Sequence, residues 1–175
     1  DSGYWIGTTY HGAAWTGDGG TTFEYYLPAT RIYDIEHGDR YPYAEMNVFV
    51  ANSFGVYRKP DTSSTFVEWD PIPAETDAVR GIALGGESAF VTTLGYGIYR
   101  TTDGGTSWEN ISSADGLSTD YGNDLVYDEV SGTILYAGDI DYSNYSFDDG
   151  QTWSQIPFAE PLVWEVAYDP YTETS

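Results

Sequence analysis

The chain contains no cysteine and only six basic residues, and both shortages limit what it can do. Without cysteine it can form neither disulfide bonds nor thiolate metal sites. Its 28 acidic residues give a formal net charge of −22, so the surface repels phosphate, which argues against binding to DNA, RNA or anionic membrane surfaces. No stretch approaches the roughly 20 consecutive apolar residues that a membrane-spanning helix needs. The sequence therefore predicts neither a nucleic-acid-binding protein nor a membrane span.

The chain also lacks any sustained helical period, and we expect very little helix. What it contains instead are short runs of β-branched and aromatic residues, bounded by Gly, Asn and Asp. Such runs are typical of β-strands. The sequence therefore predicts an all-β protein.

A short motif returns four times along the chain. Its central residues recur at intervals of 43, 42 and 45 residues, and they are Asp18, Asp61, Asp103 and Asp148. An aromatic residue follows each of them at the fifth position, namely Phe23, Phe66, Trp108 and Trp153. A spacing of this size indicates one supersecondary unit per repeat.

The motif has a physical explanation in the chemistry of tight turns. An Asp set among Gly and Thr can accept hydrogen bonds from the backbone N–H groups of its own turn, and Gly supplies positive φ without steric cost. The aromatic residue begins the outgoing strand and can pack over the hairpin. We therefore expect structural rather than catalytic roles for the four aspartates and their aromatic partners.

Written as Ser/Thr-x-Asp-x-Gly-x-Thr-Trp, the motif resembles the Asp-box, or BNR, repeat of sialidases, sortilin-type receptors, xyloglucanases and photosystem assembly factors. The copies at 101–108 and 146–153 match well, while the second copy has Lys59 for the hydroxyl residue and Ser63 for Gly. The resemblance covers essentially the whole chain and implies a β-propeller. It does not imply one particular activity.

Strands flank each copy of the motif, and four strands per repeat would make one propeller blade. We expect one domain over residues 1–175, with about four four-stranded blades. The expected bounds are about 1–30 plus 162–168 for the first blade, 31–73 for the second, 77–115 for the third and 120–160 for the fourth.

The two ends of the chain suggest how the first blade is completed. The strand around Trp5 has no innermost strand before it, whereas the segment around Val166 is an innermost strand without a blade. Joined end to end, the repeat spacing would be 45 residues, within the range seen elsewhere. We expect the Val166 strand to pair with the Trp5 strand, which closes a ring within one chain or links neighbouring chains by strand exchange. The alternative is an excerpt of a larger propeller.

Inner strands supply the candidates for chemistry. Alignment of these strands places Asp34, Asp124 and Glu165 at equivalent positions, with Arg80 beside them. Such carboxylates could provide the acid and base for glycoside hydrolysis, bind a hard cation, or cap strands and hydrate a channel. The resemblance implies three arginines for a sialidase and a second propeller for a xyloglucanase, and neither is visible here.

Oxygen-bearing side chains alternate at Asp139, Asp141 and Ser143, which suggests a calcium loop, although the spacing excludes an EF-hand. The alternative is a solvated acidic hairpin, and no cofactor other than calcium is implied. Asn110 and Asn144 begin N-glycosylation sequons.

Aromatic residues in loops could stack on sugars or fill a protein interface. They are Tyr10, Tyr41, Tyr43, Phe54, Tyr96, Tyr121 and Tyr142. The low lysine and high tyrosine content is one we associate with secreted or cell-surface proteins. We therefore expect an extracellular or cell-surface β-propeller that acts as a non-catalytic binding or structural scaffold for a glycan or protein ligand. Closure within one chain is favoured, and self-assembly through the terminal strand is the other option. The alternative function is a fragment of a sialidase-like or xyloglucanase-like glycoside hydrolase.

Overall fold

A computed structural model describes residues 3–38, 47–60, 63–69, 79–85, 88–139, 142–157, 163–167 and 169. Within these ranges the only helical element is the short 3₁₀ turn η1 (Ser113–Asp115), and the expectation of very little helix is confirmed. No helix of these ranges has the length and apolarity to cross a bilayer. The fold is all-β.

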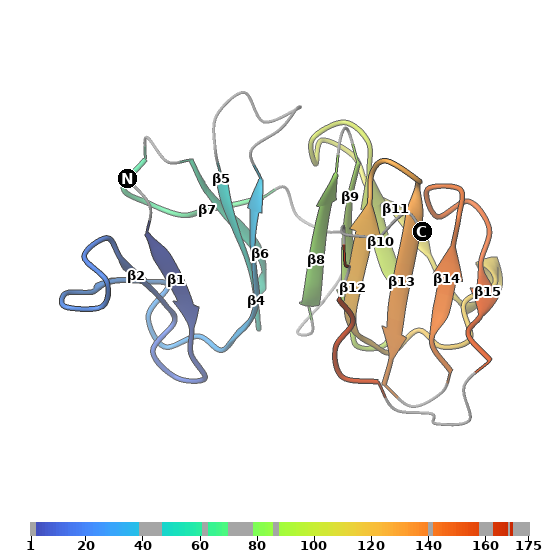
Figure 1. The fold of residues 1–175 in the computed structure, drawn as a ribbon, viewed down its shortest axis with the longest axis horizontal. Helices are drawn as coiled ribbons and strands as arrows, with labels where there is room; N and C mark the ends of the chain where they lie inside the picture. Colours follow the sequence, from blue (N-terminus) through green and yellow to red (C-terminus); the bar gives the residue numbers. More distant parts are fainter. Residues whose placement is uncertain are drawn as a thin grey trace, which may run out of the picture.

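The strands form four antiparallel sheets, numbered here as blades 1 to 4 (Figure 1). Blade 1 has three strands in the described residues: β1 (Tyr4–Gly7), β2 (Ala13–Thr16) and β3 (Glu24–Tyr26). Blade 2 has β4 (Ile32–Gly38), β5 (Asn47–Asn52), β6 (Gly55–Pro60) and β7 (Val67–Glu68). Blade 3 has β8 (Val79–Gly85), β9 (Ser88–Thr93), β10 (Ile98–Thr101) and β11 (Glu109–Ile111). Blade 4 has β12 (Gly122–Asp128), β13 (Thr133–Gly138), β14 (Asn144–Ser146) and β15 (Ser154–Gln155).

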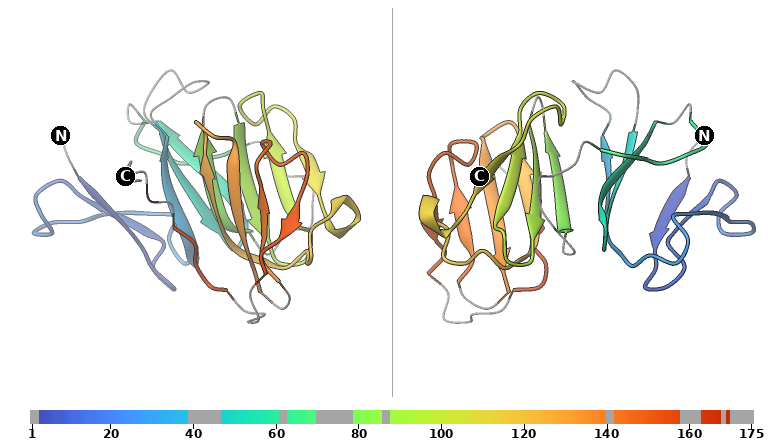
Figure 2. Two further views of the ribbon diagram at one scale, coloured as in Figure 1. Left: turned by 45° about the vertical axis from the view of Figure 1, so that its right-hand side comes forward. Right: turned by 180° about the vertical axis from the view of Figure 1, so that it is seen from behind.

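In each complete blade the strands follow chain order from the inside outward. The inner strands β4, β8 and β12 stand next to one another, so the blades fan out from a common side (Figures 1 and 2). This is the arrangement of propeller blades, and the predicted propeller architecture is confirmed.

The hydrophobic core lies between blades rather than at a single centre. One cluster, which includes Phe49, Trp69 and Ile82, joins blades 2 and 3. A second cluster, which includes Phe90, Leu125 and Tyr136, joins blades 3 and 4. Because blade 3 is covered on both faces, its second strand β9 is buried along nearly its whole length.

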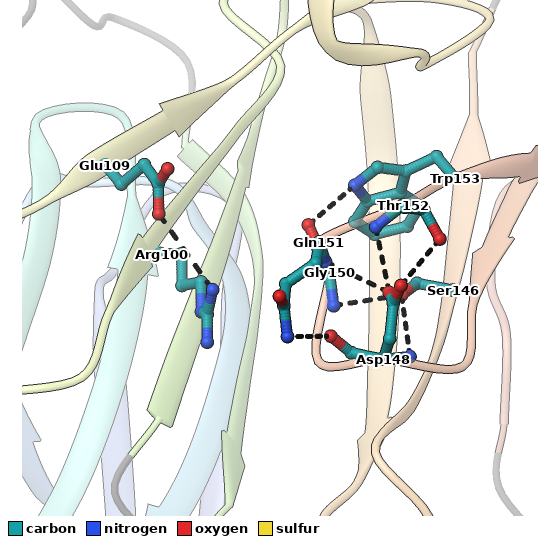
Figure 3. Close-up of polar contacts among 8 residues, drawn as sticks. All are labelled: Arg100, Glu109, Ser146, Asp148, Gly150, Gln151, Thr152 and Trp153. Atoms are coloured by element: carbon teal, nitrogen blue, oxygen red, sulfur yellow. Dashed lines mark hydrogen bonds and ion pairs between the residues drawn. The ribbon is translucent and has the colours of Figure 1, made fainter.

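The three described copies of the repeated motif form turns with the same hydrogen bonds, here called the box turns. In the turn of blade 4, Asp148 Oδ1 accepts the N–H groups of Gln151 and Thr152, and Oδ2 accepts the Thr152 hydroxyl at 2.6 Å (Figure 3). Asp18 and Asp103 make the equivalent bonds in blades 1 and 3. Asp61 lies outside the described residues.

The aromatic residues of the motif lie in different surroundings. Trp108 packs edge-on against Trp69, with 5.0 Å between ring centroids, and Trp153 packs against Tyr136. Phe66 contacts Trp5 of blade 1. Phe23 is exposed. Trp108 and Phe66 thus pack against the preceding blade, whereas the contact between Trp153 and Tyr136 lies within blade 4.

Most of the predicted strands are confirmed, but residues 163–167 are not where they were expected. These residues are not assigned to a strand, and blade 1 has three strands rather than four within the described chain; residues 162 and 168 lie outside it. The Val166 N–H donates instead to Asp124 Oδ2 at 2.9 Å, which holds the segment beside β12. The expected pairing with the Trp5 strand of the same chain, and with it ring closure, is not observed in the described residues. In Figure 1 the β4 and β8 strands lie between β1 and the segment.

The close approach of two blades predicts a specific effect at Gly105. A Cβ at this position would lie 2.4 Å from Trp69 Nε1, and φ is +87°, in the left-handed region. We expect Gly105→Ala to lower the free energy of unfolding by about 2–4 kcal/mol, since it combines backbone strain with overpacking. Urea denaturation followed by tryptophan fluorescence measures this change.

Gly20→Ala is the matched control, because Gly20 holds the same place in the box turn of blade 1. Its φ is +93°, but the nearest atom to a new Cβ is 3.8 Å away. This variant carries the backbone strain alone, about 1 kcal/mol. Equal losses in the two variants would contradict the interblade contact as the cause.

Candidate functional site

One face of the molecule gathers the candidate binding residues. The turns β1–β2, β5–β6, β9–β10 and β13–β14 lie on it, and so do the beginnings of the inner strands, since Ile32 pairs with Asn52 and Val79 with Thr93. We call it the turn face. The box turns lie at the opposite ends of the blades, because they follow strands that run away from the turn face. The arrowheads of β1 and β13 in Figure 1 point to the turn face.

Asp34, a candidate catalytic residue, lies near the start of β4 and bridges two blades. Its Oδ1 accepts the N–H of Ile35 at 2.7 Å, and its Oδ2 accepts the N–H of Ile82 in blade 3, also at 2.7 Å. Each carboxylate oxygen thus has a backbone donor. The side chain acts as a clamp between inner strands.

Asp124 repeats this geometry from blade 4. Its Oδ1 accepts the N–H of Leu125 at 2.8 Å, and its Oδ2 accepts the N–H of Val166 at 2.9 Å. Val166 therefore donates its N–H to Asp124 of blade 4 in the same way that Ile82 donates its N–H to Asp34 of blade 2. The sequence alignment of the inner strands placed these residues at equivalent positions.

Blade 3 has glycine where its neighbours have aspartate. A Cβ at Gly81 would lie 3.1 Å from both Cα and Oδ1 of Asp124. The missing side chain thus leaves room for the Asp124 carboxylate. An aspartate at position 81 would crowd Asp124.

The inner strands β4 and β12 and the segment 163–167 bring four carboxylates into electrostatic contact, namely Asp34, Glu36, Asp124 and Glu165. Burial, together with the charges of Asp124 and Glu165, raises the pKa of Asp34 to about 6, against the opposing effect of the Ile82 and Ile35 N–H groups. Burial also raises the pKa of Glu36 to about 7, with the charge of Asp34 adding to the effect. The pKa of Asp124 is raised, first by burial.

Arg80, the fourth catalytic candidate, stacks on an aromatic ring. Its guanidinium carbon lies 4.0 Å from the centroid of the Tyr33 ring, and that of Arg31 lies 5.6 Å from the same ring. A cation held over an aromatic face is stabilised by the ring quadrupole. Arg80 is thereby fixed at the start of β8, and its stacking was not expected from the sequence.

The suggested calcium loop is only partly visible. Asp139 Oδ1 accepts a hydrogen bond from Asn123 Nδ2 at 3.0 Å, and the buried Ser143 hydroxyl accepts the N–H of Gly138. Asp141 lies outside the described residues. Within the described ranges, no three His, Cys, Asp or Glu side chains gather as a metal site would require.

The two sequon asparagines differ in accessibility. Asn110 lies on β11 and is exposed, with its amide donating to the Tyr96 carbonyl at 2.6 Å. Asn144 is 1% exposed, and its Oδ1 accepts the N–H of Ser118. A glycan on Asn144 does not fit this fold, because the amide nitrogen that would carry it is enclosed.

Aromatic side chains stand exposed on the turn face. The four turns carry Tyr10, Phe54, Tyr96 and Tyr142, which are 78%, 64%, 44% and 42% exposed. Tyr121, beside Gly95 in the β9–β10 turn, is also exposed. Tyr41 and Tyr43 lie outside the described residues. The structure thus brings five of the seven aromatic candidates to one face.

Two structural residues were missed by the sequence analysis. Trp69 is fully buried and donates its indole N–H to the carbonyl of Gly104 in the box turn of blade 3. The Tyr127 hydroxyl donates to Asp149 at 2.6 Å, and burial together with this carboxylate raises the tyrosine pKa. The aromatic character of Trp69, three residues after Phe66, is the signal that could have indicated it.

Comparison with known proteins supports the fold and leaves the function open. No family model and no curated protein matches the chain. Solved structures that it resembles include the extracellular domain of BT4673 from B. thetaiotaomicron, with 16% identity and a TM-score of 0.72. An ancestral GH74 enzyme has 12% identity and a TM-score of 0.68. YCF48 bound to a D1 peptide has 13% identity and a TM-score of 0.56.

These neighbours are β-propeller proteins. The alignments cover 88%, 89% and 89% of this chain, but only 23%, 22% and 43% of the respective neighbours. The chain therefore spans less than half the length of each. At these identities the likeness shows a propeller fold.

The buried carboxylates predict an unusual dependence of stability on pH. The folded-state pKa values of Asp34 and Glu36, about 6 and 7, exceed their ordinary values of 3.8 and 4.5. The contribution of these two groups to the stability of the fold is therefore complete below about pH 4 and is lost as the pH rises through 6 to 7. The box aspartates, with lowered pKa values of about 2 for Asp103 and Asp148, act in the opposite sense and lose their contribution below pH 4. We expect thermal stability to be highest near pH 4–5.

Glu36→Gln separates the buried carboxylate from the general effect of net charge. We expect this variant to be about 1–2 kcal/mol more stable than the wild type at pH 8 and to gain less on acidification. Glu109→Gln removes the same charge from a side chain that is 70% exposed, together with a 3.9 Å ion pair to Arg100. Such a long pair with an exposed carboxylate contributes little to stability, so this variant should follow the wild-type curve. Parallel curves for wild type and Glu36→Gln would contradict the assignment.

Proposed function

We propose that this chain is a non-catalytic, ligand-binding propeller scaffold that works outside the cell. The observation that carries the proposal is the double hydrogen bonding of Asp34 and Asp124. Through backbone N–H groups, Asp34 holds the inner strand β8 and Asp124 holds the segment 163–167, so each has a structural task. A general acid or nucleophile in these positions would have to leave the strand that it holds.

The turn face is the proposed binding surface. Exposed rings there offer contact area at low entropic cost, because a tyrosine has few rotatable bonds. A rigid scaffold that presents variable turns is also the usual location of binding residues. Either a glycan or a protein segment fits these properties.

Two comparisons support the remaining parts of the proposal. The BT4673 structure is an extracellular domain, and the YCF48 structure holds a peptide. The low lysine content and the absence of cysteine agree with an exported protein. An extracellular ligand-binding role follows from these likenesses by analogy.

The proposal predicts binding without turnover. We expect no release of reducing ends from β-glucans and no release of sialic acid from sialosides over long incubation. Binding to members of a panel of glycans and peptides should weaken by about tenfold in Tyr96→Ala/Tyr121→Ala, since two rings each contribute about 0.5–1.5 kcal/mol.

Glu165→Gln tests the catalytic alternative with little risk to the fold, because Glu165 is exposed. Wild-type turnover that disappears in Glu165→Gln or Asp124→Asn, with the protein still folded by circular dichroism, would favour a glycoside hydrolase. Phe147→Ala, which changes an exposed ring on the opposite face, should leave ligand binding unchanged.

A further inference from the structure

The aromatic residues of the turn face follow the repeat of the fold. The β1–β2 turn of blade 1 carries Tyr10 and the β5–β6 turn of blade 2 carries Phe54. The β9–β10 and β13–β14 turns of blades 3 and 4 carry Tyr96 and Tyr142. Each of the four blades therefore presents an exposed ring at the tip of the same turn. The fold therefore places one exposed ring at the same position of each blade, which the sequence positions of the aromatic residues did not indicate.

Side-chain hydrogen bonds fix the turns that carry these rings. In blade 3 the Thr93 hydroxyl donates to the Gly97 carbonyl at 2.9 Å and accepts the N–H of Tyr96. In blade 1 the Thr8 hydroxyl donates to the Gly12 carbonyl at 2.9 Å and accepts the N–H of His11.

The two remaining turns are fixed by other groups. The N–H of Phe54 donates to Asn52 Oδ1 at 2.7 Å, and the N–H of Gly138 donates to the Ser143 hydroxyl. The backbone that carries the rings is therefore tied by hydrogen bonds before a ligand arrives, which reduces the entropic cost of binding.

We propose that Tyr10, Phe54, Tyr96 and Tyr142 form an arc of stacking platforms for an uncharged polysaccharide chain. The inference rests on the proposed function and names the ligand class. The rings belong to separate blades, whereas a protein partner is usually gripped by a contiguous, fully desolvated cluster. A polymer of repeating units suits separate and repeated contacts.

Charge selects among polysaccharides. The net charge of −22 opposes the binding of acidic polymers, so uronate-rich or sulfated chains are disfavoured. The Thr8–Gly12 turn contains no Asp, Glu, Lys or Arg, and the same is true of residues 53–54 and 94–97, whereas the β13–β14 turn that carries Tyr142 contains Asp139 and Asp141 and adds to the repulsion of acidic polymers. The negative face of an aromatic ring attracts the weakly positive C–H bonds on one side of a neutral sugar.

Contacts on several blades make binding depend on the length of the ligand. Once one ring is occupied, the next sugar segment reaches the neighbouring ring at a high effective concentration. We therefore expect long chains to bind much more tightly than oligosaccharides that reach one ring. Loss of a single ring should weaken polymer binding about two- to tenfold.

Affinity gel electrophoresis tests the proposal with hydroxyethylcellulose and galactomannan as uncharged probes and polygalacturonate as the acidic probe. We expect the uncharged polymers to retard the wild type and polygalacturonate to have no effect. Tyr96→Ala and Tyr142→Ala should each weaken retardation, and the variant with all four rings replaced by alanine should lose it. Tyr96→Phe, which keeps the ring, should bind like the wild type.

Phe147→Ala is the matched control, since Phe147 is 68% exposed but lies on the opposite face. Unchanged melting temperatures exclude misfolding, and the two single alanine variants keep the test valid if the fourfold variant does not fold. The inference would be overturned if neither uncharged polymer retards the wild type. It would also be overturned if Phe147→Ala loses as much retardation, relative to the wild type, as Tyr96→Ala does. Binding to peptides alone would overturn it while leaving the proposed function intact, whereas turnover of a glycan would overturn the proposed function itself.

Discussion

The capture of backbone N–H groups by aspartate carboxylates is the interaction on which this structure depends. At the box turns, Asp18, Asp103 and Asp148 each tie together a turn between two outer strands. Beside the inner strands, Asp34 of blade 2 holds the N–H of Ile82 in blade 3, and Asp124 of blade 4 holds the N–H of Val166 in the segment 163–167. A chain without cysteine has no covalent means of fixing one blade to the next. Its abundant carboxylates act as the connectors, together with aromatic side chains packed between the sheets.

The same kind of bond has opposite effects on pKa in the two places, and the cause is burial. The box aspartates are exposed, so hydrogen bonding decides the outcome and lowers their pKa values. Asp34 accepts two backbone bonds as well, yet burial and neighbouring carboxylates outweigh them and raise its pKa. A raised pKa in a cleft often marks a catalytic acid. Here the hydrogen-bond partners identify a structural clamp under electrostatic strain.

The turns and strands could be predicted from the sequence because their determinants are local. The residues that define the turn at Asp148 lie within eight positions, and strand composition is equally local. The bond between Asp34 and Ile82 spans 48 residues, and no short pattern indicates it. The repeat spacing suggested that the segment at Val166 closes on the Trp5 strand, whereas the structure holds Val166 beside β12. Ring closure depends on the angle between successive blades, which packing sets and a residue count does not contain.

The two ends of each blade carry different chemistry, and this division limits where a ligand can bind. At the end with the box turns, glycines and hydroxyl side chains are already occupied in hydrogen bonds within the turn, as at Thr152 and Ser107. At the turn face, single side chains such as Thr93 and Asn52 fix the backbone, and the aromatic rings beside them stay exposed. Those rings are not needed for the turn itself, so they can change without loss of the fold. A surface with this freedom, on a scaffold that is rigid beneath it, is the one that can be adapted to a ligand.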